Sequence, residues 1–168
     1  MSKLETDNLE KVLDDFLTEV IKKARANLKS QNINASKDLY RSFKKDINVG
    51  ANSIQAIIEA EDYLPFIDRG VKGVKGGSSL SGFRYTNKKP PVRFLQTWLK
   101  QKSGKFRQRD QKRIAFAIQN KIFNYGIKPT RFFTDPFENE YRKLPDQLIE
   151  AYGLDVDKFL KLVLDADV

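Results

Sequence analysis

Residues 113–137 read RIAFAIQNKIFNYGIKPTRFFTDPF, and this stretch sets the order of the elements around it. Ile114, Ile118 and Ile122 recur at every fourth position, which is the spacing of an apolar stripe along one helix face. Gly126 then ends the predicted helix, because helices often close on a left-handed residue and glycine adopts that conformation at little cost. The sequence therefore predicts a helix that stops at a glycine turn.

The second half of this stretch is aromatic. Phe132 and Phe133 stand side by side, and TDPF follows them at residues 134–137. Threonine and aspartate oxygens can cap a helix start, and proline suits the first helical position. We expect a new helix here, with Phe132, Phe133 and Phe137 as anchors that hold it to a sheet. The stretch offers no obvious catalytic chemistry, which favours a protein whose role is assembly.

Three groups of short motifs resemble those of the tail-completion and head–tail neck proteins of tailed bacteriophages. NYGI and PTRFFTDPF, at residues 124–127 and 129–137, resemble the C-terminal signature of that family. YLPFIDRG at residues 63–70 is similar to its Y…Y-(V/I)-(E/D)-x-G segment. DLYRS at residues 38–42 is similar to its G-x-L-x-x-S element, although the glycine is absent here. The motifs lie between about residues 35 and 138.

The resemblance implies a structural virion protein of the neck, acting as a connector, tail-completion or tail-terminator protein. It implies a small α+β fold without catalysis, cofactor or metal. It also implies a homo-oligomeric ring, six-fold or twelve-fold, around the channel through which the genome is ejected. The partners would be further copies of the chain, adjoining portal, adaptor or tail-tube proteins, and the genomic DNA in the channel. Such a protein is made in the host cytoplasm and ends in the virion, with no membrane partner.

Composition points to one ordinary domain, residues 1–168, in which 40% of the side chains are hydrophobic and can fill a core. The chain has no cysteine and no histidine. That excludes disulfides, zinc sites built on these residues, cysteine nucleophiles and Ser–His triads. We also find no apolar run as long as a membrane span and no signal-like apolar region after the start.

The apolar patterns predict an α+β fold, in which a long N-terminal helix and C-terminal helices pack on a small antiparallel sheet. Apolar residues at helical spacing predict a helix over residues 5–30, and SKLE at residues 2–5 could form its capping box. Two strands, at residues 43–49 and 53–60, flank a GAN turn and should pair as a hairpin.

Residues 63–82 lead from the hairpin into a glycine-rich stretch. One helical turn should hold Tyr63, Phe66 and Ile67 against the hairpin. The sequence GVKGVKGGSSLSG at residues 70–82 predicts a mobile loop. It does not match a phosphate-binding loop, because Gly77 stands where the lysine of that motif belongs and no strand precedes it.

Residues 69–113 form a basic, loop-rich insertion with fourteen basic side chains and one acidic one, in a chain of net charge +9. Such a segment favours nucleic acid or an acidic protein surface as a partner. Aromatic and basic residues also alternate here, so a nucleic-acid-binding module outside any virion is the alternative function. We expect most of the following residues to contact neighbouring subunits or neck proteins and a minority to face DNA: Lys72, Lys75, Arg84, Lys88, Lys89, Lys100, Lys102, Lys105, Arg107, Arg109 and Arg113.

Acidic residues gather at the end of the second predicted strand, at Glu59, Glu61 and Asp62. A divalent ion could bridge two of them, but no convincing lysine and further aspartate of a nuclease site accompany them. A solvated strand end, or a contact with a basic patch, is the simpler interpretation.

The C-terminal segment, residues 154–168, is expected to be a separate amphipathic helix. Gly153 should close the helix before it, and Asp155 should cap the new one. Asp165 and Asp167 make the end acidic, so they could meet the basic segment of a neighbouring subunit.

Overall fold

The computed structural model describes residues 6–33, 37–50, 53–102 and 108–166. These residues form seven helices and one two-stranded sheet: α1 (Asp7–Ser30), α2 (Asp38–Ser42), β1 (Lys44–Val49), β2 (Ile54–Glu59), α3 (Leu64–Asp68), α4 (Val92–Lys102), α5 (Gln108–Tyr125), α6 (Thr134–Tyr141) and α7 (Leu144–Ala166). The predicted α+β fold is confirmed, with its long N-terminal helix, C-terminal helices and small antiparallel sheet. The predicted capping box at residues 2–5 lies outside the described residues.

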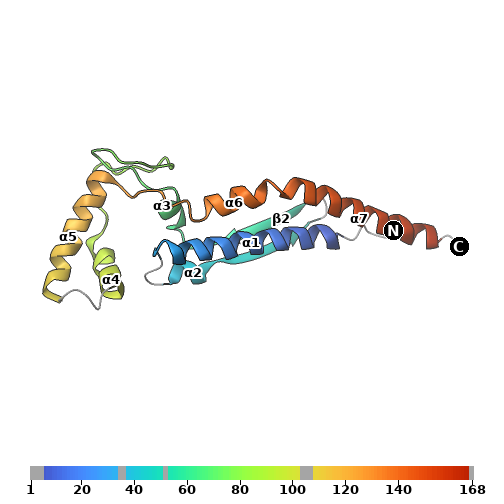
Figure 1. The fold of residues 1–168 in the computed structure, drawn as a ribbon, viewed down its shortest axis with the longest axis horizontal. Coiled ribbons are helices and arrows are strands. Elements are labelled where there is room, and N and C mark those ends of the chain that lie inside the picture. The colour runs from blue at the N-terminus through green and yellow to red at the C-terminus, as the bar shows by residue number, and fades with distance from the viewer. Residues whose placement is uncertain (1–5, 34–36, 51–52, 103–107, 167–168) are drawn as a thin grey trace.

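Helix α1 runs through the larger part of the molecule, which we call the body (Figure 1). The body consists of α1, α2, the β1–β2 hairpin, α3, α6 and α7. Helix α1 packs against both strands and against both C-terminal helices. The strands pair in an antiparallel register that sets Lys44 opposite Glu59, and Ile47 and Ile58 pack against the core. The predicted hairpin is therefore confirmed.

Two clusters of buried side chains run along α1. The first contains Ile21, Ala24, Leu28, Leu39, Phe43 and Phe132. The second contains Phe16, Leu17, Val20 and Leu144. Helix α1 supplies half of the first cluster and most of the second, because its apolar residues recur at helical spacing and form one continuous stripe.

The three predicted aromatic anchors differ in burial. Phe132 is fully buried in the first cluster. Phe133 is half-buried and stacks on Phe43, just before β1, with ring centroids 6.1 Å apart. Phe137 is 36% exposed and meets Phe16 of α1 edge-on at 5.7 Å. The anchors therefore hold α6 to α1, to Phe43 and to the first cluster, against which Ile58 of β2 also packs.

Helix α7 runs without a break over Leu144–Ala166, so the prediction of a separate C-terminal helix at residues 154–168 is wrong. Pro145 lies in the first turn, where its missing N–H would have no partner within the helix. Gly153 lies inside the helix, where glycine costs only about 1 kcal/mol relative to alanine. A long helix that is packed on α1 tolerates that cost.

Asp155 does not cap its own helix, contrary to expectation, but caps α1. It is 1% exposed, and its carboxylate accepts hydrogen bonds from the backbone N–H groups of Asn8 and Leu9 at 3.2 and 3.1 Å. The first N–H groups of a helix have no partner within it, and a negative charge is favourable at that end. A carboxylate from α7 therefore fixes the start of α1.

Asp68 plays the same part for α6. It is 1% exposed and accepts hydrogen bonds from the N–H groups of Phe133 and Thr134 at 2.8 and 3.1 Å, and one from the Thr134 hydroxyl. The predicted helix start at Thr134 is confirmed, but its capping oxygens come from Asp68 and not from the TDPF sequence itself. Asp135 pairs with Arg131 instead, at 2.5 Å.

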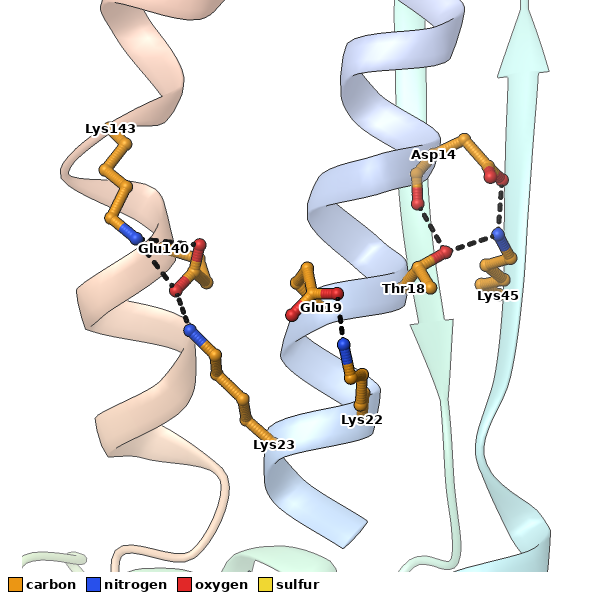
Figure 2. A network of polar contacts seen from close by, with 8 residues as sticks. All are labelled: Asp14, Thr18, Glu19, Lys22, Lys23, Lys45, Glu140 and Lys143. Atoms are coloured by element: carbon orange, nitrogen blue, oxygen red, sulfur yellow. Dashed lines mark hydrogen bonds and ion pairs between the residues drawn. The ribbon is translucent and has the colours of Figure 1, made fainter. Parts of the chain in front are cut away.

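Ion pairs tie α1 to the elements beside it (Figure 2). Lys23 Nζ lies 2.5 Å from Glu140 Oε1, which links α1 to α6, and Lys143 approaches both oxygens of the same carboxylate at 3.2 Å. On β1, Lys45 Nζ lies 2.6 Å from the Asp14 carboxylate of α1. The hydrogen bond from Lys23 is the main reason why the pKa of Glu140 lies below the ordinary glutamate value.

Candidate functional site

Helices α4 and α5 form a helical hairpin that stands away from the body, and we call this hairpin the arm (Figure 1). The two helices contact each other and make no substantial contact with the helices or strands of the body. Leu99 and Ala115 are buried between them, whereas Leu95, Ile114 and Ile118 are only half-buried. Two helices can bury only the sides that face each other, so the arm has a small core and a partly apolar surface.

A junction made of residues 69–85 and 122–131 joins the arm to the body. Val71 and Ile127 exchange two backbone hydrogen bonds, of 2.9 and 2.8 Å. One segment precedes the arm in the sequence and the other follows it. Their pairing therefore holds the two ends of the arm together and fixes where the arm begins and ends.

The glycine-rich part of the junction caps the C-terminus of α5. The N–H groups of Val74 and Lys75 donate to the carbonyl oxygens of Phe123 and Asn124, at 2.9 and 2.8 Å. These carbonyls belong to the last turn of α5, which cannot satisfy them itself. The prediction of a mobile loop at residues 70–82 does not fit this bonded arrangement.

Glycines allow the two segments of the junction to approach each other closely. A Cβ atom at Gly73 would lie 2.3 Å from the carbonyl oxygen of Asn124, and one at Gly126 would lie 2.0 Å from that of Val71. Gly126 also has a positive φ of 78°, which confirms the predicted left-handed end of α5. The glycines of this region are thus needed for close backbone contact.

Helix α3 divides its apolar side chains between the body and the junction. Leu64 and Ile67 pack against the first core cluster, whereas Tyr63 is 38% exposed. Phe66 packs on Phe83 of the junction, with ring centroids 4.6 Å apart. Of the residues expected to hold this turn against the hairpin, Ile67 packs on the core, whereas Phe66 packs on the junction instead.

The entrance to the arm is held by a second aromatic contact. Tyr85 packs beside Phe123 of α5, with ring centroids 6.3 Å apart, and burial raises the pKa of its hydroxyl. Lys89 also contacts this end of α5, with Nζ 5.7 Å from the Phe123 ring centroid and 2.8 Å from Asn120 Oδ1. These contacts attach the segment before α4 to the end of α5.

The predicted contact residues are distributed over the junction and the arm. Three are exposed on the junction: Lys72, Lys75 and Arg84. Four are exposed on the arm or at its entrance: Lys88, Lys89, Lys100 and Arg113. Two belong to α4 and α5, with side chains outside the described part of the structure: Lys102 and Arg109. Two fall wholly outside the described residues: Lys105 and Arg107.

Three further basic residues, which are not among the predicted contact residues, share this surface. Arg93, Lys112 and Lys121 are all exposed on α4 and α5. The guanidinium carbon of Arg93 lies 4.9 Å from the ring centroid of Phe94, which is itself 61% exposed. The sequence could have indicated these residues, because they lie on the same two predicted helices as the predicted contact residues. Basic side chains on one helix add to the same charged surface.

The basic side chains of the arm lack carboxylate partners within the described structure. The ion pairs among the described side chains all lie outside it, on α1, β1, α6, α7 and the residues next to them. Between residues 69 and 127, Asp110 is the single acidic residue. Cations that are not neutralised within the chain create a positive potential that attracts an anionic partner.

The acidic residues at the end of β2 line a shallow pocket on the body. Glu59, Glu61 and Asp62 share it with Ser42 and Lys44. Within the described ranges, no group of three or more acidic side chains is arranged to hold a metal ion. The basic ammonium group beside the carboxylates fits the interpretation of this region as a solvated strand end.

None of the described helices combines the length and the apolar character that crossing a membrane requires. No protein-family model, curated protein or solved structure matches the chain.

Proposed function

We propose that the chain is a structural virion protein of a tailed bacteriophage, which assembles with copies of itself into a ring at the head–tail junction. In this proposal it serves as a neck, tail-completion or tail-terminator protein around the DNA channel. It works by shape and charge, without catalysis, and its further partners are the adjoining portal, adaptor or tail-tube proteins.

The convergence of the resembling motifs carries this proposal. Leu39, from the motif at residues 38–42, and Phe132, from the C-terminal motif, share one core cluster. Asp68, from the motif at residues 63–70, caps α6 through the N–H groups of Phe133 and Thr134. Motifs that are distant in the sequence therefore form one structural unit, as expected if together they specify a fold.

The separation of the arm from the body also supports this function. A ring requires two different surfaces on each subunit, because one surface meets the other on the next copy. The basic arm and the body with its internal ion pairs offer such unlike surfaces. Most arm cations would then contact protein, since a wall that bound many phosphates would hold back the DNA that must leave.

Two observations on the purified protein test the proposal. We expect a solution mass of several subunits, and electron micrographs of rings with a central channel. In a phage that carries the gene, a stop mutation should leave filled heads and complete tails that do not join. A monomer at all concentrations, or normal virions from the stop mutant, would overturn the proposal.

The alternative, a nucleic-acid-binding module outside a virion, is favoured by the exposed Phe94 ring beside Arg93. Exposed aromatic and cationic groups can stack on bases and contact phosphates. This function predicts tight binding of DNA or RNA whose affinity falls steeply with salt. The neck protein should bind duplex DNA only weakly at physiological salt.

A further inference from the structure

Helix α7 carries an apolar stripe that the body leaves uncovered. Ile149, Tyr152, Val156, Leu160 and Val163 recur at spacings of three or four residues, which places them along one face. Ile149 is 72% exposed and Leu160 is 52% exposed. Val156, in the middle of the stripe, is half-buried. Single exposed apolar residues are ordinary, but a largely exposed stripe marks a surface for another molecule.

The end of α7 extends beyond the helix on which it packs. Asp155 contacts Asn8 in the first turn of α1, so residues 156–166 continue past the described start of α1 (Figure 1). At the opposite end of the molecule stands the arm. The two features therefore lie too far apart to meet within one copy.

The arm also has apolar side chains that no other element of the described structure covers. Phe94 on α4 is 61% exposed and Phe116 on α5 is 44% exposed. Apart from each other, α4 and α5 pack substantially against no helix or strand of the described structure. An added amphipathic helix would complete a three-helix core around the side chains that the hairpin leaves half-buried.

Charge decides which two surfaces can meet. Residues 144–168 contain six acidic and two basic side chains, a net charge of −4. Residues 88–125 contain eleven basic side chains and one acidic one, a net charge of +10. Pairing two α7 ends or two arms would bring like charges together, whereas pairing an α7 end with an arm joins opposite charges.

We propose that the apolar stripe of α7 in one copy packs against the α4–α5 arm of the next copy. This inference rests on the proposed self-assembly and names the surfaces that make it. The contact is heterologous, because each copy offers its α7 end to one neighbour and its arm to the other. Repetition of the same contact closes a ring when the rotation between copies allows it.

Two double variants that change no charge test the contact. The first, Leu160→Gln with Val163→Gln, alters the stripe, and the second, Phe94→Gln with Phe116→Gln, alters the arm. Glutamine is polar and favours helix, so both variants should stay folded, which circular dichroism checks. Leu154→Gln is the matched control, because Leu154 is 52% exposed but lies on another face of α7. Sedimentation velocity gives the mass of each sample.

Each double variant alone should lose association by about tenfold or more, because two apolar side chains no longer leave water at the contact. The control should assemble like the wild type, and raising the salt concentration should weaken assembly. A mixture of the two double variants should form a dimer that grows no further, because one intact α7 end and one intact arm remain. Such a dimer arises only from a heterologous contact.

The other outcomes overturn the inference. Dimers of the arm variant alone would show pairing of two α7 ends, and dimers of the stripe variant alone would show pairing of two arms. Normal assembly of both variants would place the interface elsewhere, although rings in the neck would still support the proposed function. Conversely, the mixture could form the expected dimer while the stop mutant still joins heads to tails. That outcome would uphold this contact and reject the proposed function.

Discussion

The side-chain amide of Asn8 donates a 2.7 Å hydrogen bond to the carboxylate of Asp155, across 147 positions of sequence. The same carboxylate accepts the backbone N–H groups of Asn8 and Leu9. One buried acidic side chain of α7 therefore completes the first turn of α1. This contact sets how the first and the last helix of the chain lie against each other.

Replacing Asp155 with alanine should destabilise the fold. The change leaves partly buried N–H groups without their acceptor, so we expect the free energy of unfolding to fall by about 1–3 kcal/mol. Chemical denaturation measures the difference. Asp157→Ala is the matched control, because its side chain is 59% exposed and pairs with Lys161 on the same helix. Equal losses in both variants would show that the Asp155 cap contributes nothing specific.

Replacing Asp68 with alanine should loosen the start of α6. The N–H groups of Phe133 and Thr134 lose their acceptor, so their hydrogen exchange should become faster than in the wild type. The amide of Val20, inside α1, provides an internal reference for global stability. If the amides of Phe133 and Thr134 keep their protection relative to Val20, the cap does not hold this helix start.

Three glycine-to-alanine variants should have different effects on the stability of the fold. Gly73→Ala should destabilise the fold by about 1–3 kcal/mol, because the new Cβ atom would meet the backbone of Asn124. Gly153→Ala should stabilise it by about 0.5–1 kcal/mol, since this glycine is helical and has open space around it. Gly82→Ala meets nothing within 4 Å and should change little. Thermal unfolding ranks the three, and a stable Gly73→Ala variant would contradict the close contact in the junction.

Truncating the aromatic anchors should cost stability in the order of their burial. Phe132→Ala should lower the free energy of unfolding by about 3–5 kcal/mol, as expected for a fully buried phenylalanine. Phe137→Ala should cost much less, because over a third of that side chain remains exposed to water. Urea denaturation of both variants provides the comparison. A larger loss for Phe137 than for Phe132 would contradict the described core.

The stabilisation that Glu140 provides should depend on pH. Its pKa is lower in the folded chain, mainly through the hydrogen bond from Lys23, so its stabilisation is complete above the unfolded pKa. It is lost as the pH falls through the folded pKa. The stability difference between the wild type and Glu140→Gln should therefore be constant near neutral pH and shrink in acid, measured by urea denaturation.

Glu19→Gln is the control for this experiment, because Glu19 forms an exposed pair with Lys22 on the surface of α1 (Figure 2). Exposed pairs of this kind contribute little to stability. A difference for Glu140→Gln that does not change with pH would argue against the charged contact with α1.

Local sequence determined the elements of this protein. The repeat of apolar residues in α1 and α5, the alternation in the hairpin and the left-handed Gly126 at the end of α5 all follow from patterns within a few residues. Each of these patterns reflects the geometry of a single helix, strand or turn, so it is visible without knowing what lies nearby.

Tertiary structure decided which residues meet. Nothing local distinguishes Phe132 from Phe133, yet one is fully buried and the other is not. The caps from Asp68 and Asp155 and the glycine contacts of the junction join segments that are far apart in the sequence. The separation of the arm from the body also depends on which helices find partners. Local patterns contain no information about such contacts, because they arise only when the whole chain has packed around α1.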